Sequence, residues 1–292
     1  MTTSDSPQDP SFAVVTPTYL PDLSRCELLA ESLDRCAPQV PHYLIVDRRD
    51  LPAFRHLQRG RRSLIESEQL VGKWMWRLPG RKGLWLSMRA LPVRGWILQQ
   101  ILKIASPDLI RERTLVFCDS DTAFLRGFSR VDLLVDGKVG LLDVEWPSDS
   151  PRRWTAAARR LLGLPQRDGG YHNHVGNMIC WNRENVSGMR ERIETCNGMH
   201  WQVALARTTS FSEYMLYGTY VREILEYRGS DHAPSAVPLV KASWGTPLIG
   251  EDVLRRFFAE LDPQTVAIMV HSKDGVDPSQ YRTFLERAWR RA

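Results

Sequence analysis

The stretch from Thr114 to Asp121 reads TLVFCDSD, and it decides the fold. The apolar run Thr114 to Cys118 predicts a buried central strand, and two carboxylates, Asp119 and Asp121, follow where the strand gives way to a turn. Carboxylates two residues apart can point toward one cation, and Mg²⁺ and Mn²⁺ prefer such hard oxygen ligands. The alternative is a turn with Asp at capping positions.

On the N-terminal side, Phe12 to Val15 predicts a strand that ends in the loop TPTY. Ser24 is expected to begin a helix, with Glu27 placed for a capping box, and His42 to Val46 predicts a second strand. A strand, a helix and a strand within about 35 residues are typical of a βαβ unit and therefore of a parallel sheet.

The rest of the chain is predicted to alternate in the same way. Helices are expected at 96–105, 211–227, 253–261 and 279–291, and strands at 139–144, 177–181 and 265–270. The stretch 50–95, rich in Arg, Trp and Gly, has poor periodicity and is interpreted as a functional loop region. We expect one α/β domain at 11–276 with a mostly parallel sheet, between a disordered tail at 1–10 and an amphipathic C-terminal helix at 277–292.

Composition narrows the class of protein. The 292 residues are 43% hydrophobic and 25% charged, with a net charge of +5, which is ordinary for a globular protein whose partners are anionic. Five cysteines without C-x-x-C spacing argue against zinc and disulfide frameworks and favour a reducing cytoplasm. The polar first ten residues are not a signal peptide, and no run of about 18 apolar residues predicts a membrane span.

Four segments resemble glycosyltransferases of the GT-A type. The run from Leu115 to Phe124 resembles their D-x-D strand, Val14 to Tyr19 their opening strand and nucleotide loop, and Trp96 to Lys103 the helix before the D-x-D strand. With the segment Phe211 to Gly218 they look like a little-characterised bacterial family of such enzymes. The resemblance implies a GT-A fold and a hexosyltransferase that takes a nucleotide-sugar donor, with a UDP-sugar favoured over a GDP-sugar.

The same resemblance, more distantly to family 8 retaining enzymes, implies a metal and phosphate site. Asp119, Asp121 and His271 would bind Mn²⁺ or Mg²⁺, with Asp119 contacting metal or ribose, and Lys273 would contact the diphosphate. Imidazole is an acceptable ligand for Mn²⁺, and an ammonium group suits phosphate.

Other candidates surround the donor. Thr16, Thr18, Tyr19 and Asp47 are placed for the nucleoside, with an aromatic ring to stack on the base and a carboxylate to accept from it. Two cations, Lys73 and Arg94, are candidates for the diphosphate or else ordinary surface charges.

Two further groups concern the sugars. His172, Asn173 and His174 precede a predicted strand and suit sugar hydroxyls, whereas Glu213 is either a general base or acceptor clamp or only the cap of a helix. The acceptor is expected to be a glycan, a lipid or a small natural product rather than nucleic acid, with peripheral membrane contact through the C-terminal helix. A nucleotidyltransferase and a basic module that binds nucleic acid or a membrane surface are the alternatives.

Overall fold

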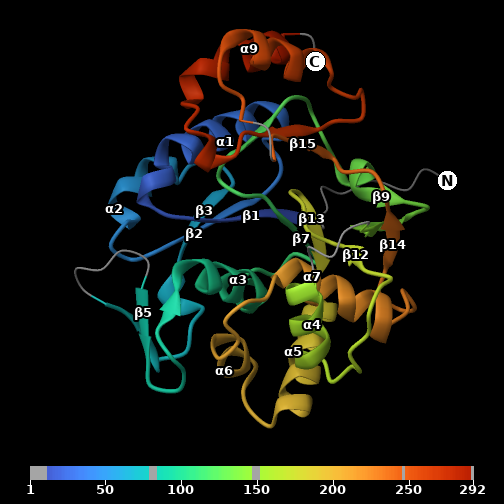
Figure 1. The fold of residues 1–292 in the computed structure, drawn as a ribbon. Coiled ribbons are helices and arrows are strands. Elements are labelled where there is room, and N and C mark those ends of the chain that lie inside the picture. Colours follow the sequence, from blue (N-terminus) through green and yellow to red (C-terminus); the bar gives the residue numbers. More distant parts are fainter. Residues whose placement is uncertain (1–11, 79–83, 147–151, 245–246, 291–292) are drawn as a thin grey trace, which may run out of the picture.

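The computed structural model describes residues 12–78, 84–146, 152–244 and 247–290, and its centre is a mostly parallel five-stranded sheet (Figure 1). The strands lie in the order β13 (Ile179–Asn182), β7 (Thr114–Phe117), β1 (Phe12–Thr18), β2 (His42–Val46) and β3 (Arg62–Glu66). Strands β7, β1, β2 and β3 run parallel, and β13 is antiparallel to β7. The predicted mixed α/β fold is confirmed.

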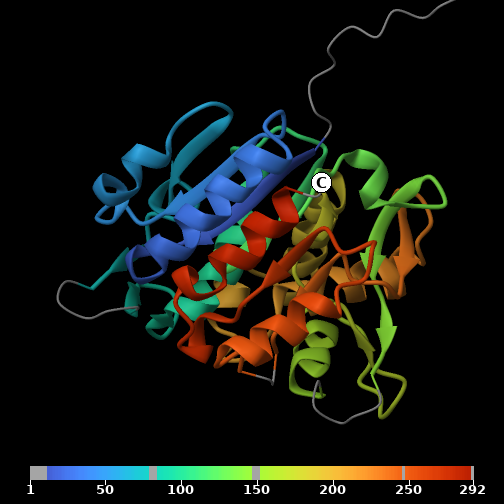
Figure 2. The ribbon, with the colours of Figure 1, turned by 90° about the horizontal axis from the view of Figure 1, so that it is seen from above.

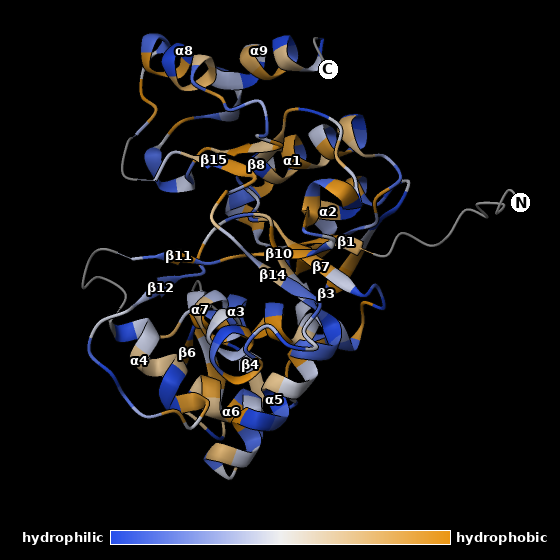
Figure 3. Ribbon diagram, turned by 90° about the vertical axis from the view of Figure 1, so that its right-hand side faces the viewer, coloured by the Kyte–Doolittle hydropathy of each residue, from blue (hydrophilic) through white to orange (hydrophobic). Residues whose placement is uncertain are grey.

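Helices cover both faces of this sheet. Alternate residues of β1 point to opposite faces, so Val14 packs with Leu29 of α1 (Leu23–Cys36), while Val15 joins a second core with Ile101 of α3 (Gly95–Ala105). The second core also contains residues of α4 (Arg152–Leu161), α5 (Arg183–Asn197), α6 (Trp201–Ala206) and α7 (Glu213–Thr219). Strands β1 and β7 are accordingly mainly hydrophobic in Figure 3.

A second layer follows the D-x-D turn and packs against α1, with α9 above α1 in Figure 1 and running over it in Figure 2. It contains a three-stranded sheet in the order β15 (Val240–Ala242), β16 (Ala267–Met269) and β8 (Thr122–Phe124), with α8 (Glu251–Ala259) and α9 (Pro278–Trp289). The indole Nε1 of Trp289 donates to the carbonyl of Phe124 at 2.8 Å. Helix α9 therefore packs its apolar side against the protein.

Three small sheets complete the described fold. They are β14 (His232–Ser235) with β10 (Lys138–Leu142) and β9 (Leu134–Val135), the pair β11 (Val144–Glu145) and β12 (His172–Asn173), and the meander β4 (Met75–Arg77), β5 (Leu84–Ser87) and β6 (Val93–Arg94). Short helical turns lie at Leu20–Asp22, Leu51–Phe54, Arg55–Leu57, Ser67–Gln69, Ser106–Asp108, Arg130–Leu133 and Ser272–Asp274.

The structure corrects three sequence predictions. The stretch 50–95 is not one loop region, because it forms β3 and the meander. Helix α1 begins at Leu23 without a side-chain cap, and Glu27 accepts a hydrogen bond from His56 instead of forming a capping box. The helix predicted to reach Tyr227 is α-helical only to Thr219 and continues as a π-helix over Tyr220–Ile224. The tail expected at 1–10 lies outside the described residues.

Candidate active site

The D-x-D turn lies at the carboxyl end of β7, the edge at which the parallel strands β1, β2 and β3 also end. The N–H of Thr122 donates to the carbonyl of Asp119 at 3.1 Å and closes the turn. The N–H of Asp119 donates to the side-chain oxygen of Asn177 at 3.1 Å. The Asp119 side chain is 43% exposed, so one carboxylate of the pair faces the outside at the predicted ligand edge.

A buried lysine joins this turn to α7. The Nζ of Lys103 lies 3.1 Å from Oδ1 of Asp119, 2.9 Å from Oε1 of Glu213 and 2.8 Å from the hydroxyl of Tyr214. The side chains of Lys103 and Glu213 are only 6% and 7% exposed. The ammonium group also lies 4.4 Å from the centre of the Tyr214 ring. Lys103 is not among the residues predicted for the site from the sequence, although it is the only charged residue in the apolar helix α3.

Lys103 is held in its charged form. Burial opposes the charge, but the carboxylates of Asp119 and Glu213 outweigh it and raise the pKa of Lys103 well above its usual value. For the neighbouring Tyr214, burial itself raises the pKa of the hydroxyl well above its usual value. One buried ammonium group thus contacts two carboxylates, the buried one of Glu213 and the exposed one of Asp119.

Glu213 is the first residue of α7 and does not cap it. Ser212 is the N-cap, with its hydroxyl accepting from the N–H of Met215 at 3.4 Å. The N–H of Glu213 donates to the side-chain oxygen of Gln100 at 3.0 Å, and its carboxylate binds Lys103. The capping-box interpretation of Glu213 is wrong, because a capping box needs its acidic residue at the third helical position.

Asp121 is the buried member of the pair. Its Oδ2 accepts from the N–H of Ser272 at 2.9 Å, whereas its buried Oδ1 has no hydrogen-bond partner among the described residues. Burial, reinforced by the charge of Asp119, raises the pKa of Asp121 to about 7. A cation beside these carboxylates would supply the missing contact and relieve their repulsion.

Asp22 adds a third acidic side chain on the α1 side of the turn. Its Oδ2 accepts from the hydroxyl of Ser120 at 3.2 Å. Burial raises the pKa of Asp22, and the negative charge of Asp119 contributes to the rise.

The donor set fits a divalent ion only in part. Nowhere in the part of the chain that the structure describes do three His, Cys, Asp or Glu side chains lie close enough together to hold a metal. The imidazole of His271 faces Asp274, with Nδ1 3.7 Å from Oδ1. A Mg²⁺ ion is usually bound by one or two protein carboxylates, and substrate phosphates supply further ligands. Asp119 and Asp121 are therefore sufficient for such a site without His271.

Of the four residues expected at the nucleoside, one has an accessible side chain and three are buried or paired with another residue. Tyr19 is half-exposed, and its pKa is raised by burial and by nearby Asp22, which places it near the D-x-D turn. Thr16 and Thr18 are buried, and the hydroxyl of Thr16 is bonded to His42 at 3.1 Å. Asp47 is paired with Arg77 at 2.8 Å. Of these four, Tyr19 has the most accessible side chain.

The cations expected at the diphosphate are exposed and dispersed along the chain. Lys73 precedes β4, Arg94 ends β6 at the entrance to α3, and Lys273 lies in the turn Ser272–Asp274 that contacts Asp121. Lys273 and His271 are thus brought to the D-x-D turn by the chain that follows β16.

The residues expected at the sugar lie on or beside β12. His172 donates from Nδ1 to Asp143 at 2.6 Å, and His174 is buried with its Nδ1 donating to the carbonyl of Leu142 at 2.7 Å. A Cβ added at Gly218 of α7 would lie 2.1 Å from the His174 ring, so β12 and α7 are in close contact. Asn173 accepts from the N–H of Val175.

Asp143 holds this part of the site together and was not found from the sequence. Its side chain is 2% exposed and accepts from His172, from Arg222 at 2.7 Å and from the hydroxyl of Tyr227. Burial alone would raise the pKa of Asp143, but the hydrogen bond from Tyr227 and the charge of Arg222 outweigh it and lower the pKa.

A cavity of about 300 Å³ adjoins Asn177, whose amide binds the N–H of Asp119. Its walls come from the β9–β10–β14 sheet, the edge strand β13 and the chain before β15. Space for a small group is therefore present beside the D-x-D turn.

Fold and site together describe a mixed α/β protein with an acidic, lysine-bridged site at the carboxyl edge of its central sheet. The chain belongs to a family described as "Family of unknown function (DUF6492)", whose model matches residues 12–230. No curated protein matches it.

Solved structures with a similar course of the chain include three glycosyltransferases. Mouse xyloside xylosyltransferase 1 is 9% identical, with 91% of this chain and 99% of that chain covered and a TM-score of 0.49. An active-site mutant of LgtC is 12% identical, with 94% and 95% covered and a TM-score of 0.48. The glycosyltransferase GlyE of Streptococcus pneumoniae TIGR4 is 12% identical, with 95% and 59% covered and a TM-score of 0.49. Similarity this low leaves function to be argued from the site.

Proposed function

We propose that this protein is a glycosyltransferase that moves a sugar from a nucleoside-diphosphate sugar to an acceptor hydroxyl with the help of Mn²⁺ or Mg²⁺. The observation that carries the proposal is the lysine bridge between Asp119 of the D-x-D turn and Glu213 of α7. In this proposal the exposed carboxylate of Asp119 would bind the cation and the carboxylate of Glu213 would meet the substrate hydroxyl, with the ammonium group of Lys103 between them.

Each residue has a separate task in this proposal. Asp119 and Asp121 would hold the divalent ion together with the donor phosphates, and His271 would join them after its ring turns away from Asp274. The bound ion would neutralise the charge that develops on the leaving diphosphate. Lys103 would hold the carboxylate of Glu213 in a fixed orientation through its 2.9 Å hydrogen bond. Tyr19 would stack on the base, and Lys273 would contact the diphosphate.

The residues on and beside β12 would bind sugar hydroxyls. His172 has one ring nitrogen fixed by Asp143 and a side chain that is 21% exposed. A histidine oriented in this way presents its other nitrogen in a defined direction, which suits recognition of a hydroxyl.

The test is a panel of UDP- and GDP-sugars, scored for release of the nucleoside diphosphate with Mn²⁺, with Mg²⁺ and with excess EDTA. We expect turnover with one class of donor that stops in EDTA and falls at least about 10²-fold in Asp121→Asn, because an unscreened diphosphate is a poor leaving group. Asp136→Asn, an exposed change in the turn between β9 and β10, is the control and should retain the parent rate. Full turnover of Asp121→Asn, or in EDTA, would contradict the proposal.

A further inference from the structure

The meander β4–β6 has one face built into the protein. Met75 on β4, Trp85 on β5 and Val93 on β6 are each less than 5% exposed and belong to the core under the central sheet. The meander is thus a packed element with a fixed position. It lies at the edge of the molecule, where β5 is labelled in Figure 1 and the same chain lies at the left in Figure 2.

The other face of the meander is apolar as well. Trp76, which is 42% exposed, lies opposite Leu86 on the neighbouring strand. Leu84 lies opposite the exposed Arg94. An antiparallel sheet with one face in water normally carries polar residues on that face. Here the outward positions carry tryptophan, leucine and arginine.

The turn after β5 presents two more apolar side chains. Met88 and Leu91 are 77% and 76% exposed. The hydroxyl of Ser87 accepts from the N–H groups of Arg89 and Ala90, and the guanidinium of Arg207 donates to the carbonyl of Arg89 at 2.9 Å. The backbone of this turn is therefore held by hydrogen bonds, and its exposed apolar side chains stand on a fixed support.

The stretch of chain that forms the meander carries charges of one sign, although Arg77 of β4 is paired with Asp47 from another stretch. From Gln69 to Pro107 the chain contains Lys and Arg but no Asp or Glu. Among the described residues, Lys73, Arg89 and Arg94 are exposed. Trp96 is 47% exposed at the start of α3, two residues after Arg94, and its ring centre lies 6.1 Å from that of Trp154.

We propose that the outer face of the meander, formed by Trp76, Leu86, Met88, Arg89, Leu91 and Arg94, docks on an anionic lipid bilayer. Basic side chains are attracted to acidic headgroups, tryptophan is favoured at the boundary between headgroups and acyl chains, and exposed aliphatic side chains gain by insertion. A soluble polyanion would satisfy the cations but would leave Met88 and Leu91 in water.

This surface replaces the C-terminal helix as the expected membrane contact. The apolar side of α9 is occupied, since Tyr281 and Leu285 are at most 2% exposed and Trp289 bonds to Phe124. No helix in the described ranges is long and apolar enough to cross a membrane. The docking proposed here is peripheral, and it does not depend on the glycosyltransferase proposal.

The experiment is vesicle flotation of the full chain. The vesicles contain either phosphatidylcholine alone or phosphatidylcholine with phosphatidylglycerol. We expect binding to the anionic vesicles that weakens at high salt, and a loss of at least about tenfold in partitioning for the double variant Met88→Ser/Leu91→Ser. The matched control is Val131→Ser/Ile249→Ser, which removes two side chains that are 76% and 67% exposed elsewhere on the molecule. The control should bind as the parent does.

Four results would overturn the proposal: no binding of the parent chain to anionic vesicles, equal losses in both double variants, unchanged binding in Met88→Ser/Leu91→Ser, or a loss in Arg89→Gln of heparin binding alone. Circular dichroism of each variant checks that the fold is retained. Arg89→Gln should weaken binding to anionic vesicles. Binding to heparin is measured in parallel. If Arg89→Gln weakens only the binding to heparin, a soluble polyanion is the partner and the bilayer is excluded. Release of nucleoside diphosphate in solution tests the proposed transferase separately, so that either proposal can fail alone.

Discussion

At the scale of single residues, Lys103 couples two carboxylates that belong to different elements. Removing one partner of a buried ion pair leaves an uncompensated charge, which is strongly destabilising. A test of Glu213 therefore has to keep its contact with Lys103, which lies 2.9 Å away. Glutamine can accept the same hydrogen bond from Lys103 but cannot take up a proton, and Asp119 remains to compensate the ammonium charge.

We expect Glu213→Gln to unfold near the parent temperature and to transfer sugar about 10²–10⁴-fold more slowly, the range for loss of a general base. The measurement is a pair of assays on one preparation, thermal unfolding and transfer to acceptor. Donor hydrolysis without acceptor then separates a base from an acceptor clamp. A variant that melts normally and transfers sugar at the parent rate would leave Glu213 with a structural task alone.

The sequence could indicate the acidic residues of the site but not their partners. Asp119 and Asp121 follow a recognisable strand, and Glu213 lies at a recognisable helix start. Lys103 and Asp143 carry no such local signal, because their importance comes from residues far away in the sequence: Glu213 is 110 positions from Lys103, and Arg222 is 79 positions from Asp143. A lone lysine among the apolar residues of α3 is the one clue that was present.

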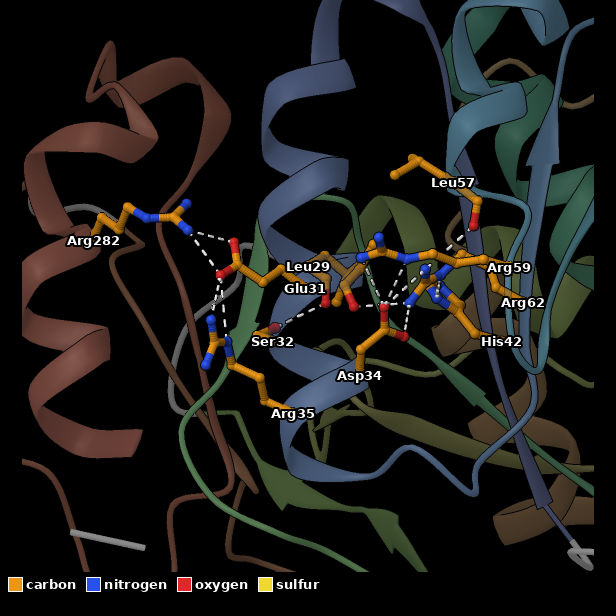
Figure 4. A network of polar contacts seen from close by, with 11 residues as sticks. Leu29, Glu31, Ser32, Asp34, Arg35, His42, Leu57, Arg59, Arg62 and Arg282 are labelled. Carbon is orange, nitrogen blue, oxygen red and sulfur yellow. Dashed lines mark hydrogen bonds and ion pairs between the residues drawn. The ribbon is translucent and has the colours of Figure 1, made fainter. Parts of the chain in front are cut away.

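At the scale of elements, one buried guanidinium joins α1, β2 and β3 (Figure 4). Arg62 donates to Asp34 at 2.5 Å, to the carbonyl of Ala30 at 2.8 Å and to Nδ1 of His42 at 2.9 Å. Its side chain is 1% exposed, whereas Arg59, which also contacts Asp34, is 63% exposed. The carboxylate of Asp34 thus pairs with one buried arginine, Arg62, and one exposed arginine, Arg59.

This pair of arginines gives a matched prediction. Arg62→Leu should lower the free energy of unfolding by about 1–3 kcal/mol, because the buried ring of His42 and the carbonyl of Ala30 lose their hydrogen-bond donor. Arg59→Leu should cost no more than about 1 kcal/mol, as exposed ion pairs do. Urea unfolding of both variants measures the difference. Equal costs would mean that burial does not set the value of this contact.

Elements with strong local patterns were predicted, and those decided by tertiary contacts were not. The strands β1, β2 and β7 are continuous apolar runs, as expected of strands buried on both faces. The meander was missed because its strands are short and both its faces are apolar, so alternation gives no signal. The predicted helix at 211–227 changes to a π-helix after Thr219, which reflects packing rather than propensity.

At the scale of the whole molecule, the D-x-D turn is shared by two layers. The turn follows β7 of the central sheet and enters β8, which pairs with β16 of the C-terminal layer. The N–H groups of Val270 and Ser272 bond to the backbone and side chain of Asp121. These two donors lie beyond residue 230, where the family match ends. The chain outside that match therefore completes the surroundings of Asp121.

The global stability should depend on pH through buried histidines. Burial lowers the pKa of His232 from 6.5 to about 4 and lowers the pKa of His42 well below its usual value. Asn182 and Asn185 donate to the hydroxyl of Tyr217, which leaves that hydroxyl to donate to Nε2 of His232. Nδ1 of His232 then carries the proton and donates to the carbonyl of Val139. The contact at Nε2 requires the neutral ring, because a protonated Nε2 could no longer accept from Tyr217.

The sign follows from the lowered pKa. Between pH 6.5 and pH 4, His232 is protonated in the unfolded chain but neutral in the folded protein. The contribution of His232 to the free energy of unfolding is therefore complete above pH 6.5. It falls by about 3 kcal/mol as the pH is lowered to 4. Asp121 titrates in the same range with the opposite sign, because its folded pKa is raised to about 7. Asp143, with a lowered pKa, loses its contribution only below the usual range of a carboxyl group. The dependence of the parent's free energy of unfolding on pH is thus a sum over several groups. The prediction therefore concerns the difference in that free energy between the parent and a variant without His232.

We expect His232→Asn to be less stable than the parent at pH 7.5, because the ring and its hydrogen bonds are lost. The difference between the free energies of unfolding of the parent and the variant should shrink by about 3 kcal/mol by pH 4, since asparagine does not titrate. Urea unfolding at intervals from pH 7.5 to 4 measures this gap. His56→Gln is the control, because His56 is exposed and pairs with the exposed Glu27, and an exposed pair contributes no more than about 1 kcal/mol to stability. A gap for His232→Asn that stays constant over the whole range would show that His232 does not titrate below its ordinary pKa on folding.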